Sequence, residues 1–236
     1  MAEPDAAAPP LARPDGGLPQ ARQRLLLAAR QLNASGLNQG TAGNLSLRWG
    51  EGLLITPSSL PYDRMLAEDL VLLAADGRMR GAAAGRRPSS EWRLHADLLR
   101  SRPEVQAVVH CHSIRATALA CHGRGIPAFH YMVVQAGGSD IRCAPYATFG
   151  GQELSDRALE ALRNRRACLL AHHGQVTLGR DLDQALQLAV EVETLAHMYL
   201  EALRLGEPPA LEAAEMERVA ARMAALHYGA AAPSGR

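Results

Sequence analysis

Short apolar runs alternate with longer segments of helical periodicity along most of this chain, and that alternation limits the fold to the α/β class. The strand-like runs are LSLRW, LLIT, LVLL, AVVHCH, ACLLA and GQVTL. Helices are predicted over residues 20–34, 90–101, 113–121, 151–164, 181–205 and 211–226. No internal repeat is visible, and the pattern leaves the order of the strands open.

The size of the chain favours a single domain. With 236 residues, 47% of them apolar, it can build one well-buried core but hardly two. We assign this domain to residues 20–230. Residues 1–19 are rich in Ala, Pro and Gly without periodicity, which predicts a disordered tail, and residues 231–236 predict a flexible C-terminus.

The clearest helix extends from Asp181 to Leu205. Its apolar residues follow one another at alternating spacings of three and four, which places them on one face. They are Leu182, Ala185, Ala189, Val192, Ala196, Tyr199 and Leu203. Gly206 and Pro208 then end the helix.

The charged residues exclude several kinds of chemistry. All 25 positive charges are arginine, because the chain has no lysine. A Schiff-base aldolase, a pyridoxal-phosphate enzyme and a Walker-type nucleotide site each need a lysine amine, so all three are excluded. The net charge of +1 gives no broad field that would attract nucleic acid or a membrane surface. A small molecule is therefore the expected partner.

The cysteines and the hydropathy pattern predict a cytoplasmic protein. The four cysteines are widely spaced and form no C-x-x-C pair, as is typical of reduced thiols. The N-terminus lacks the continuous apolar segment of a secretory signal, and no run of apolar residues is long enough to cross a membrane.

Histidines gather at the ends of two predicted strands. The period of two in VQAVVHCH directs His110 and His112 to one face and Cys111 to the other, an arrangement typical of two nitrogen ligands of zinc. The alternative is a pair of polar groups satisfied at a strand end. A second apolar run ends in His172 and His173, of which only one can readily face the same metal ion. Three histidines at strand ends favour a metal site over three unrelated core residues.

A carboxylate and a fourth histidine lie in the segment PSSEWRLH. Ser89 or Ser90 is the expected N-cap of a helix, with Glu91 in its first turn. Glu91 then either stabilises the helix dipole or moves a proton beside a metal ion. His95 lies one turn further on, and we interpret it as a buried, hydrogen-bonded residue. No metal role is assigned to the remaining histidines, His122, His130, His197 and His227.

Three turns built from small residues offer a way to bind phosphate without lysine. Backbone N–H groups and hydroxyls at such turns hold anions well, although each turn alone is an ordinary loop signal. The residues concerned are Gly43, Asn44, Ser58, Ser59, Ser89 and Ser90.

Together these motifs resemble the class II aldolase and adducin-head family, and within it the bacterial L-fuculose-1-phosphate aldolases. The resemblance covers nearly the whole chain after residue 20. It rests on the strings GLNQGTAGNLSLR, LLITPSSLPYD, PSSEWRLH, AVVHCH, IPAFHYM, CAPYATFG, LLAHHG and AVEVETLAHMYL, in that order.

The resemblance implies a role for each matched residue. His110, His112 and His173 are the implied zinc ligands; His173 is chosen over His172 because the family uses the histidine directly before glycine. Glu91 is included in the implied metal site and is also the implied acid/base. The six small residues named above match positions that hold the substrate phosphate. Ser59 replaces a glycine that these aldolases usually have.

Three aromatic residues also match family positions. Tyr131 matches a tyrosine that reaches a neighbouring subunit's site and exchanges a proton with the aldehyde-side oxygen. Phe149 and Tyr228 match residues that shape the aldehyde pocket. The implied fold is a three-layer α/β/α sandwich around a mainly antiparallel sheet, assembled as a homotetramer with sites between subunits.

The implied reaction is the zinc-dependent cleavage of a ketose 1-phosphate of the L-fuculose 1-phosphate type into dihydroxyacetone phosphate and a short aldehyde such as lactaldehyde. The alternative within the family is a salvage aldolase acting on 5-deoxyribulose 1-phosphate or 5-methylthioribulose 1-phosphate. A methylthioribulose-phosphate dehydratase, a pentulose-phosphate 4-epimerase and a non-catalytic adducin-like module rank lower, and a metallohydrolase is a further possibility outside the family.

Overall fold

The computed structural model describes residues 17–226 and Tyr228. Helix α1 begins at Gly17, so the predicted tail boundary at residue 19 is three residues too late. Most of that tail and the C-terminus beyond residue 230 lie outside the described residues. The helices are α1 (Gly17–Ala34), α2 (Trp92–Ser101), α3 (Ile114–Cys121), α4 (Gln152–Ala161), α5 (Leu182–Leu203) and α6 (Ala213–Ala225), with short 3₁₀ helices η1 (Ala67–Asp69) and η2 (Tyr131–Ala136).

The strands form one eight-stranded sheet in the order β4-β3-β2-β1-β5-β8-β7-β6. All neighbouring strands are antiparallel except β6 and β7. Their bounds are β1 (Asn44–Trp49), β2 (Gly52–Ile55), β3 (Val71–Leu73), β4 (Met79–Gly81), β5 (Ala107–Cys111), β6 (Arg142–Ala144), β7 (Ala167–Leu170) and β8 (Gly174–Gly179). The mainly antiparallel α/β fold that the resemblance implies is thus confirmed.

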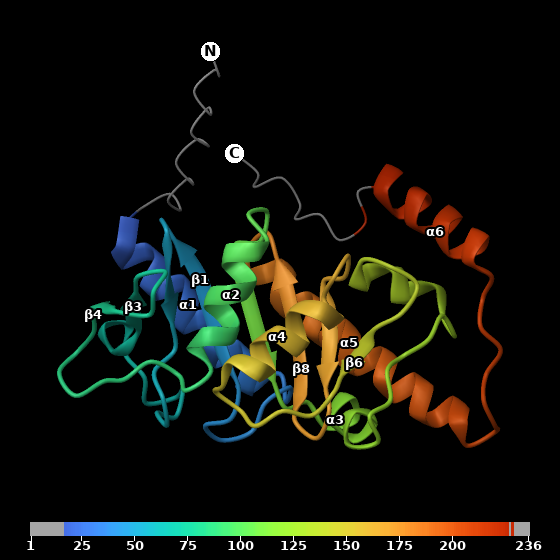
Figure 1. Cartoon of the computed structure of the whole chain (residues 1–236), viewed down its shortest axis with the longest axis horizontal. Coiled ribbons are helices and arrows are strands. Elements are labelled where there is room, and N and C mark those ends of the chain that lie inside the picture. Colours follow the sequence, from blue (N-terminus) through green and yellow to red (C-terminus); the bar gives the residue numbers. More distant parts are fainter. Residues whose placement is uncertain (1–16, 227, 229–236) are drawn as a thin grey trace, which may run out of the picture.

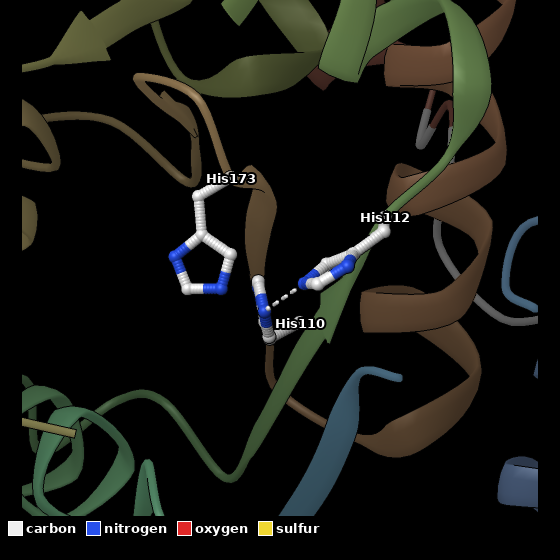
Figure 2. Close-up of side chains that lie close together, drawn as sticks. All are labelled: His110, His112 and His173. Carbon is white, nitrogen blue, oxygen red and sulfur yellow. Dashed lines mark hydrogen bonds between the residues drawn. The ribbon is translucent and has the colours of Figure 1, made fainter. Parts of the chain in front are cut away.

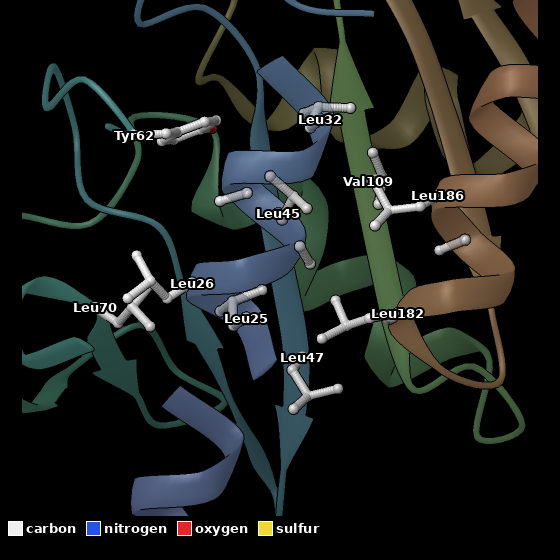
Figure 3. Packing of buried hydrophobic residues seen from close by; sticks show 14 of the residues in the cluster. Leu25, Leu26, Leu32, Leu45, Leu47, Tyr62, Leu70, Val109, Leu182 and Leu186 are labelled. Carbon is white, nitrogen blue, oxygen red and sulfur yellow. The ribbon is translucent and has the colours of Figure 1, made fainter. Parts of the chain in front are cut away.

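Helices cover both faces of this sheet, as can be followed in Figure 1. On one face, α1 and the first half of α5 pack on Leu45, Leu47 and Val109, a cluster drawn in Figure 3. On the other face, α2 and α4 pack on residues such as Val108 and Val176. Successive residues of β5 therefore enter opposite cores, as the period of two predicts.

A third cluster joins α3, η2, α5 and α6 at one end of the molecule. The buried residues of α5 include Leu182, Ala185, Ala189, Val192, Ala196 and Tyr199, which confirms the helical face predicted from their spacing. Among the described residues, no helix combines the length and apolar character needed to span a lipid bilayer.

The alternation along β1 prepares the site. Leu45 and Leu47 face the α1 side, whereas Ser46 faces the α2 side and bonds to His95 there. Asn44 pairs with His110 across β1 and β5. The polar residues of both strands therefore meet on the α2 side, at one end of the sheet.

Candidate active site

The structure brings the three predicted histidine ligands together. His110 lies on β5, His112 directly follows that strand, and His173 lies in the turn between β7 and β8 (Figure 2). One ring nitrogen of each falls within 4.8 Å of the others. The ring centroids are separated by 4.7 Å, 4.9 Å and 5.0 Å. The three nitrogens are therefore close enough together to bind one metal ion.

A hydrogen bond to the backbone fixes the orientation of His110. Its Nδ1 donates to the carbonyl oxygen of Gln175 on the neighbouring strand β8, at 2.9 Å. This bond leaves Nε2 free to face the cluster, where it lies 3.1 Å from Nε2 of His112. A ligating histidine commonly has its second nitrogen held in this way. Cys111, between the two, is fully buried in the opposite core.

The turn after β7 decides which of the paired histidines faces the cluster. His172 has a left-handed backbone with φ 55°, and this reversal directs His173 inward. The ring of His172 instead meets Tyr146 edge-on, with the centroids 5.9 Å apart. Gly174 follows, where a Cβ atom would lie 2.4 Å from the carbonyl oxygen of Cys111. Glycine is therefore required here, where β8 comes close to β5.

Glu91 contacts the histidine cluster rather than its own helix. The predicted N-cap at Ser89 or Ser90 is wrong, because α2 begins at Trp92 and Glu91 itself is the preceding residue, without a side-chain cap bond. The hydroxyl of Ser89 accepts from the backbone N–H of Glu91 at 3.2 Å. Glu91 Oε2 lies 3.3 Å from His110 Nε2, and Oε1 lies 3.4 Å from His173 Nε2.

A line of buried side chains holds the Glu91 carboxylate. Asn44 Nδ2 donates to Oε2 of Glu91 at 2.9 Å, which leaves Asn44 Oδ1 to accept from Nε2 of His95 at 2.5 Å. Nδ1 of His95 then accepts from the Ser46 hydroxyl at 2.7 Å. His95 is fully buried, and burial lowers its pKa to about 3, so it is neutral near pH 7. This confirms the interpretation of His95 as a buried, hydrogen-bonded residue.

The electrostatics of the cluster suit a cation. Burial lowers the pKa values of His110, His112 and His173, the last to about 4, so that the imidazoles are neutral and able to bind a metal ion near pH 7. Burial raises the pKa of Glu91, but His110, His173 and Asn44 together lower it below its ordinary value. The carboxylate is therefore ionised at neutral pH.

The cluster opens into a cavity of about 370 Å³. We divide its lining residues into two groups by their place in the sequence. The first group, called the first wall, consists mainly of small residues: Thr41, Ala42, Gly43, Asn44, Pro57, Ser58, Ser59, Ser89 and Ser90. The second wall is richer in aromatic side chains: His112, Tyr146, Ala147, Phe149, His172 and His173. All six residues predicted to hold phosphate line the first wall, and no arginine is among the described lining residues.

Close backbone approaches shape the first wall. Gly43 has φ 71°, and a Cβ atom there would lie 2.7 Å from both Asn38 Oδ1 and the carbonyl oxygen of His110. The hydroxyl of the buried Tyr62 donates to the Gly43 carbonyl at 3.0 Å and holds this turn. Ser59 has φ 58°, a left-handed conformation that costs glycine little.

The predicted aromatic residues divide between this cavity and other surfaces. Phe149 lines the second wall and is 64% exposed. Tyr131 begins η2, is 46% exposed and is not among the lining residues. Tyr228 lines a separate cavity between η2, α5 and α6. Tyr146, for which no role was predicted from the sequence, lies three residues before Phe149 and lines the same wall.

Comparison with known proteins agrees with this geometry. Residues 23–200, which include the three histidines and Glu91, match the model of the class II aldolase and adducin N-terminal domain. The chain belongs to this family. The predicted family and the predicted enzyme class, a class II aldolase, are both confirmed.

The relatives named below are similar over most of their length. A 5-methylthioribulose-1-phosphate/5-deoxyribulose-1-phosphate aldolase of Rhodospirillum rubrum is 54% identical over 213 residues, covering 90% of this chain and 95% of the relative. The L-fuculose phosphate aldolase of Escherichia coli K12 is 47% identical over 178 residues, or 75% and 81% of the two chains. A solved L-fuculose 1-phosphate aldolase superposes with a TM-score of 0.83 at 36% identity, covering 87% of this chain and 96% of the other.

Proposed function

We propose that this class II aldolase is zinc-dependent and cleaves a ketose 1-phosphate between C3 and C4, releasing dihydroxyacetone phosphate and a short aldehyde. The observation that carries the proposal is the cluster of three neutral imidazoles beside an ionised, buried carboxylate, in a cavity lined by both hydroxyl and aromatic side chains. Such a cavity can receive a substrate that carries both a phosphate and a small apolar group.

The residues present fit a divalent ion. His110, His112 and His173 offer three nitrogen donors, the set that zinc commonly takes in catalytic sites. Oε1 of Glu91 is buried and has no hydrogen-bond partner among the described residues, which a cation beside it would compensate. When bound, such an ion supplies a Lewis acid that polarises the substrate carbonyl. The absence of lysine excludes the usual Schiff-base route of aldolases and supports this alternative.

Glu91 is placed to move a proton at C3 of the substrate. Its Oε2 is held by Asn44, whereas Oε1 is free of hydrogen bonds. When the C3–C4 bond breaks, the electron pair of that bond stays with the C3 fragment. Glu91, which first takes up a proton from solvent, transfers it to C3 and completes dihydroxyacetone phosphate, while the C4 hydroxyl gives up its own proton. The ionised Glu91 takes up the corresponding proton in the synthetic direction.

The proton on the C4 hydroxyl needs a second group. Tyr131 matches the family tyrosine with this role and is half exposed, but it lies outside the cavity of its own chain. We assign Tyr131, and with it the aldehyde-pocket residue Tyr228, to the site of an adjacent subunit in a homotetramer. Phe149 serves the site of its own chain.

Phosphate binding is assigned to the first wall of the cavity. The hydroxyls of Ser58 and Ser89 and the backbone N–H groups of neighbouring residues can surround an anion without a basic side chain. Each of these turns is fixed from outside. Tyr62 bonds to Gly43, Ser58 N donates to the carbonyl of Arg87, and Ser89 N donates to the carbonyl of Thr56.

For the substrate itself, the comparisons favour the alternative over the first choice of the sequence analysis. The Rhodospirillum rubrum relative is the more similar of the two named enzymes and is covered almost completely. We therefore propose 5-methylthioribulose 1-phosphate and 5-deoxyribulose 1-phosphate as substrates. Tyr146 and Phe149 supply aromatic surface for a methyl or methylthio tail. L-fuculose 1-phosphate is the second candidate, because an aldolase for it is also 47% identical.

One experiment tests both the reaction and the substrate order. The zinc-loaded protein is incubated with each of the three ketose 1-phosphates, and the rate of dihydroxyacetone phosphate release is measured, with Glu91→Gln as the control. We expect the highest kcat/KM on a salvage substrate and release by the control that is slower by about 10²- to 10⁴-fold. Faster cleavage of L-fuculose 1-phosphate would reverse the substrate order. No release from any substrate despite bound zinc would refute the aldolase reaction and leave dehydration or epimerisation to be tested.

A further inference from the structure

Helix α3 begins two residues after the ligand His112, and its N-terminus is satisfied in an unusual way. The first N–H groups of a helix need acceptors, which a serine at the N-cap position normally provides. Ser113 occupies that position but makes no side-chain cap bond. Its hydroxyl accepts instead from Nε2 of Gln175 at 2.7 Å, and both side chains are fully buried.

Glu193 of α5 replaces the missing cap. Its Oε1 accepts from the backbone N–H of Arg115 at 2.8 Å, and its Oε2 accepts from the N–H groups of Arg115 and Ala116 at 3.1 Å and 2.9 Å. The side chain is half-buried, which protects these bonds from water. A carboxylate is also the favoured charge at a helix N-terminus, and its hydrogen bonds are stronger than those of a neutral acceptor.

The same region of α5 also helps to hold His110, the ligand that lies on β5 itself. The backbone oxygen of Gln175 accepts from Nδ1 of His110, and the side chain of Gln175 donates to the Ala189 carbonyl on α5 at 3.1 Å. The segment from His110 to Ala116 is thus held at its start through Gln175 and at its end through Glu193. In Figure 2, helix α5 (brown) lies beside the green ribbon that carries His110 and His112.

We propose that Glu193 is a positioning residue for the metal site. By fixing the first turn of α3, it sets the direction in which the chain leaves β5 and therefore where the imidazole of His112 lies relative to His110. The proposal rests on the proposed metal site, to which Glu193 contributes no ligand. Removing a residue that orients a metal ligand without touching the metal typically lowers metal affinity by about 10- to 100-fold. We expect an effect of this size for Glu193.

The test measures metal binding rather than turnover. Metal-free wild type, Glu193→Ala and Glu193→Gln are titrated with Zn²⁺ in competition with a chromogenic chelator, and Co²⁺ absorption spectra report the ligand geometry. The matched control is Glu201→Ala, which also removes a carboxylate from α5 but one in an exposed pair with Arg204. All titrations are made well below the melting temperature of each variant, so that loss of fold does not contribute.

We expect the zinc dissociation constant of Glu193→Ala to rise about 10-fold or more, with an altered Co²⁺ spectrum. Glu193→Gln should show a smaller rise, because its amide oxygen can still accept from the helix. Glu201→Ala should equal wild type. A dissociation constant of Glu193→Ala within about twofold of wild type would overturn the proposal and leave Glu193 as a plain helix cap. If Glu193→Ala fails to fold, Glu193→Gln decides, and a zinc dissociation constant and Co²⁺ spectrum equal to those of wild type would overturn the proposal. Absence of zinc binding by wild type would instead refute the metal site.

Discussion

The two halves of the site are built by different means. The carboxylate half comprises Asn44, Ser46, Glu91 and His95, and its members hold one another through side-chain hydrogen bonds. The histidine half comprises the three clustered histidines, which depend on backbone features. These are a carbonyl of β8, a helix N-terminus and a turn that ends in an obligatory glycine.

This difference separates proton chemistry from metal geometry. A line of side chains can be broken by one substitution without moving a strand, and the group at its end, Glu91, is the one proposed to transfer a proton. Backbone anchors change only when the chain path changes, which suits ligands that must keep fixed distances. Substitutions in the carboxylate half should therefore lower turnover and leave metal binding intact, whereas those in the histidine half should weaken metal binding first.

Glu91→Gln gives the largest effect within this scheme. The amide keeps the shape of the side chain and an oxygen that can accept from Asn44, but it cannot deliver a proton to C3. We expect kcat to fall by about 10²- to 10⁴-fold, while one zinc ion per chain is retained. Steady-state kinetics and metal analysis of the same preparation give both quantities. Loss of zinc along with activity would show that the two halves are not separable.

His95→Leu tests the carboxylate half one step further from the chemistry. Leucine leaves Asn44 Oδ1 and the Ser46 hydroxyl without a partner, so the Asn44 amide is no longer held against Glu91. We expect kcat to fall about 10-fold, as for removal of other groups that orient a site residue, with unchanged zinc affinity.

The control for His95→Leu is His197→Leu, which removes an exposed histidine from α5. Kinetics and zinc titration of both variants provide the measurement. A kcat for His95→Leu equal to that of the control would show that Asn44 keeps its orientation without His95.

The sequence revealed much of the histidine half because its signals are local. The period of two in β5 places His110 and His112 on one face, and the helical spacing of α5 predicts its buried side. Glu193 could not be found in this way, because it is 78 residues from Arg115 and reads as an ordinary polar position on a helix. Its function depends on how α3 and α5 pack, which no local pattern encodes.

In the carboxylate half, residue identity was easier to predict than geometry. Glu91 was identified, but the start of α2 was misplaced because serines before an apolar helix usually cap it.

The short strands β4 and β6 were missed, since three residues such as Met79–Gly81 carry too little periodicity to be recognised. Tyr146 gave no signal because a loop residue has no face to predict.

Tyr146→Ala tests whether the aromatic wall contributes to substrate choice. Removing the ring takes away a sulfur–aromatic contact of about 0.3–1.5 kcal/mol. We therefore expect kcat/KM for 5-methylthioribulose 1-phosphate to fall by about 2- to 12-fold relative to that for 5-deoxyribulose 1-phosphate. Tyr146→Phe, which keeps the ring, should preserve the ratio. Equal losses on both substrates would show that Tyr146 acts on the shared part of the substrate, or on the neighbouring His172, and not on the tail.

Ser59→Gly should give the smallest change, and it asks whether the first wall binds phosphate through its backbone. Ser59 has φ 58°, where a side chain costs roughly 1–2 kcal/mol and glycine costs little. Glycine also loses about 0.5–1 kcal/mol more backbone entropy on folding, so the free energy of unfolding should rise by about 0 to 1.5 kcal/mol. The backbone N–H remains, and KM should therefore change by less than about threefold, an energy below 1 kcal/mol. Denaturation curves and steady-state kinetics measure the two effects. A tenfold rise in KM would show that the Ser59 hydroxyl itself holds the phosphate, and that this wall, like the carboxylate half, works through side chains.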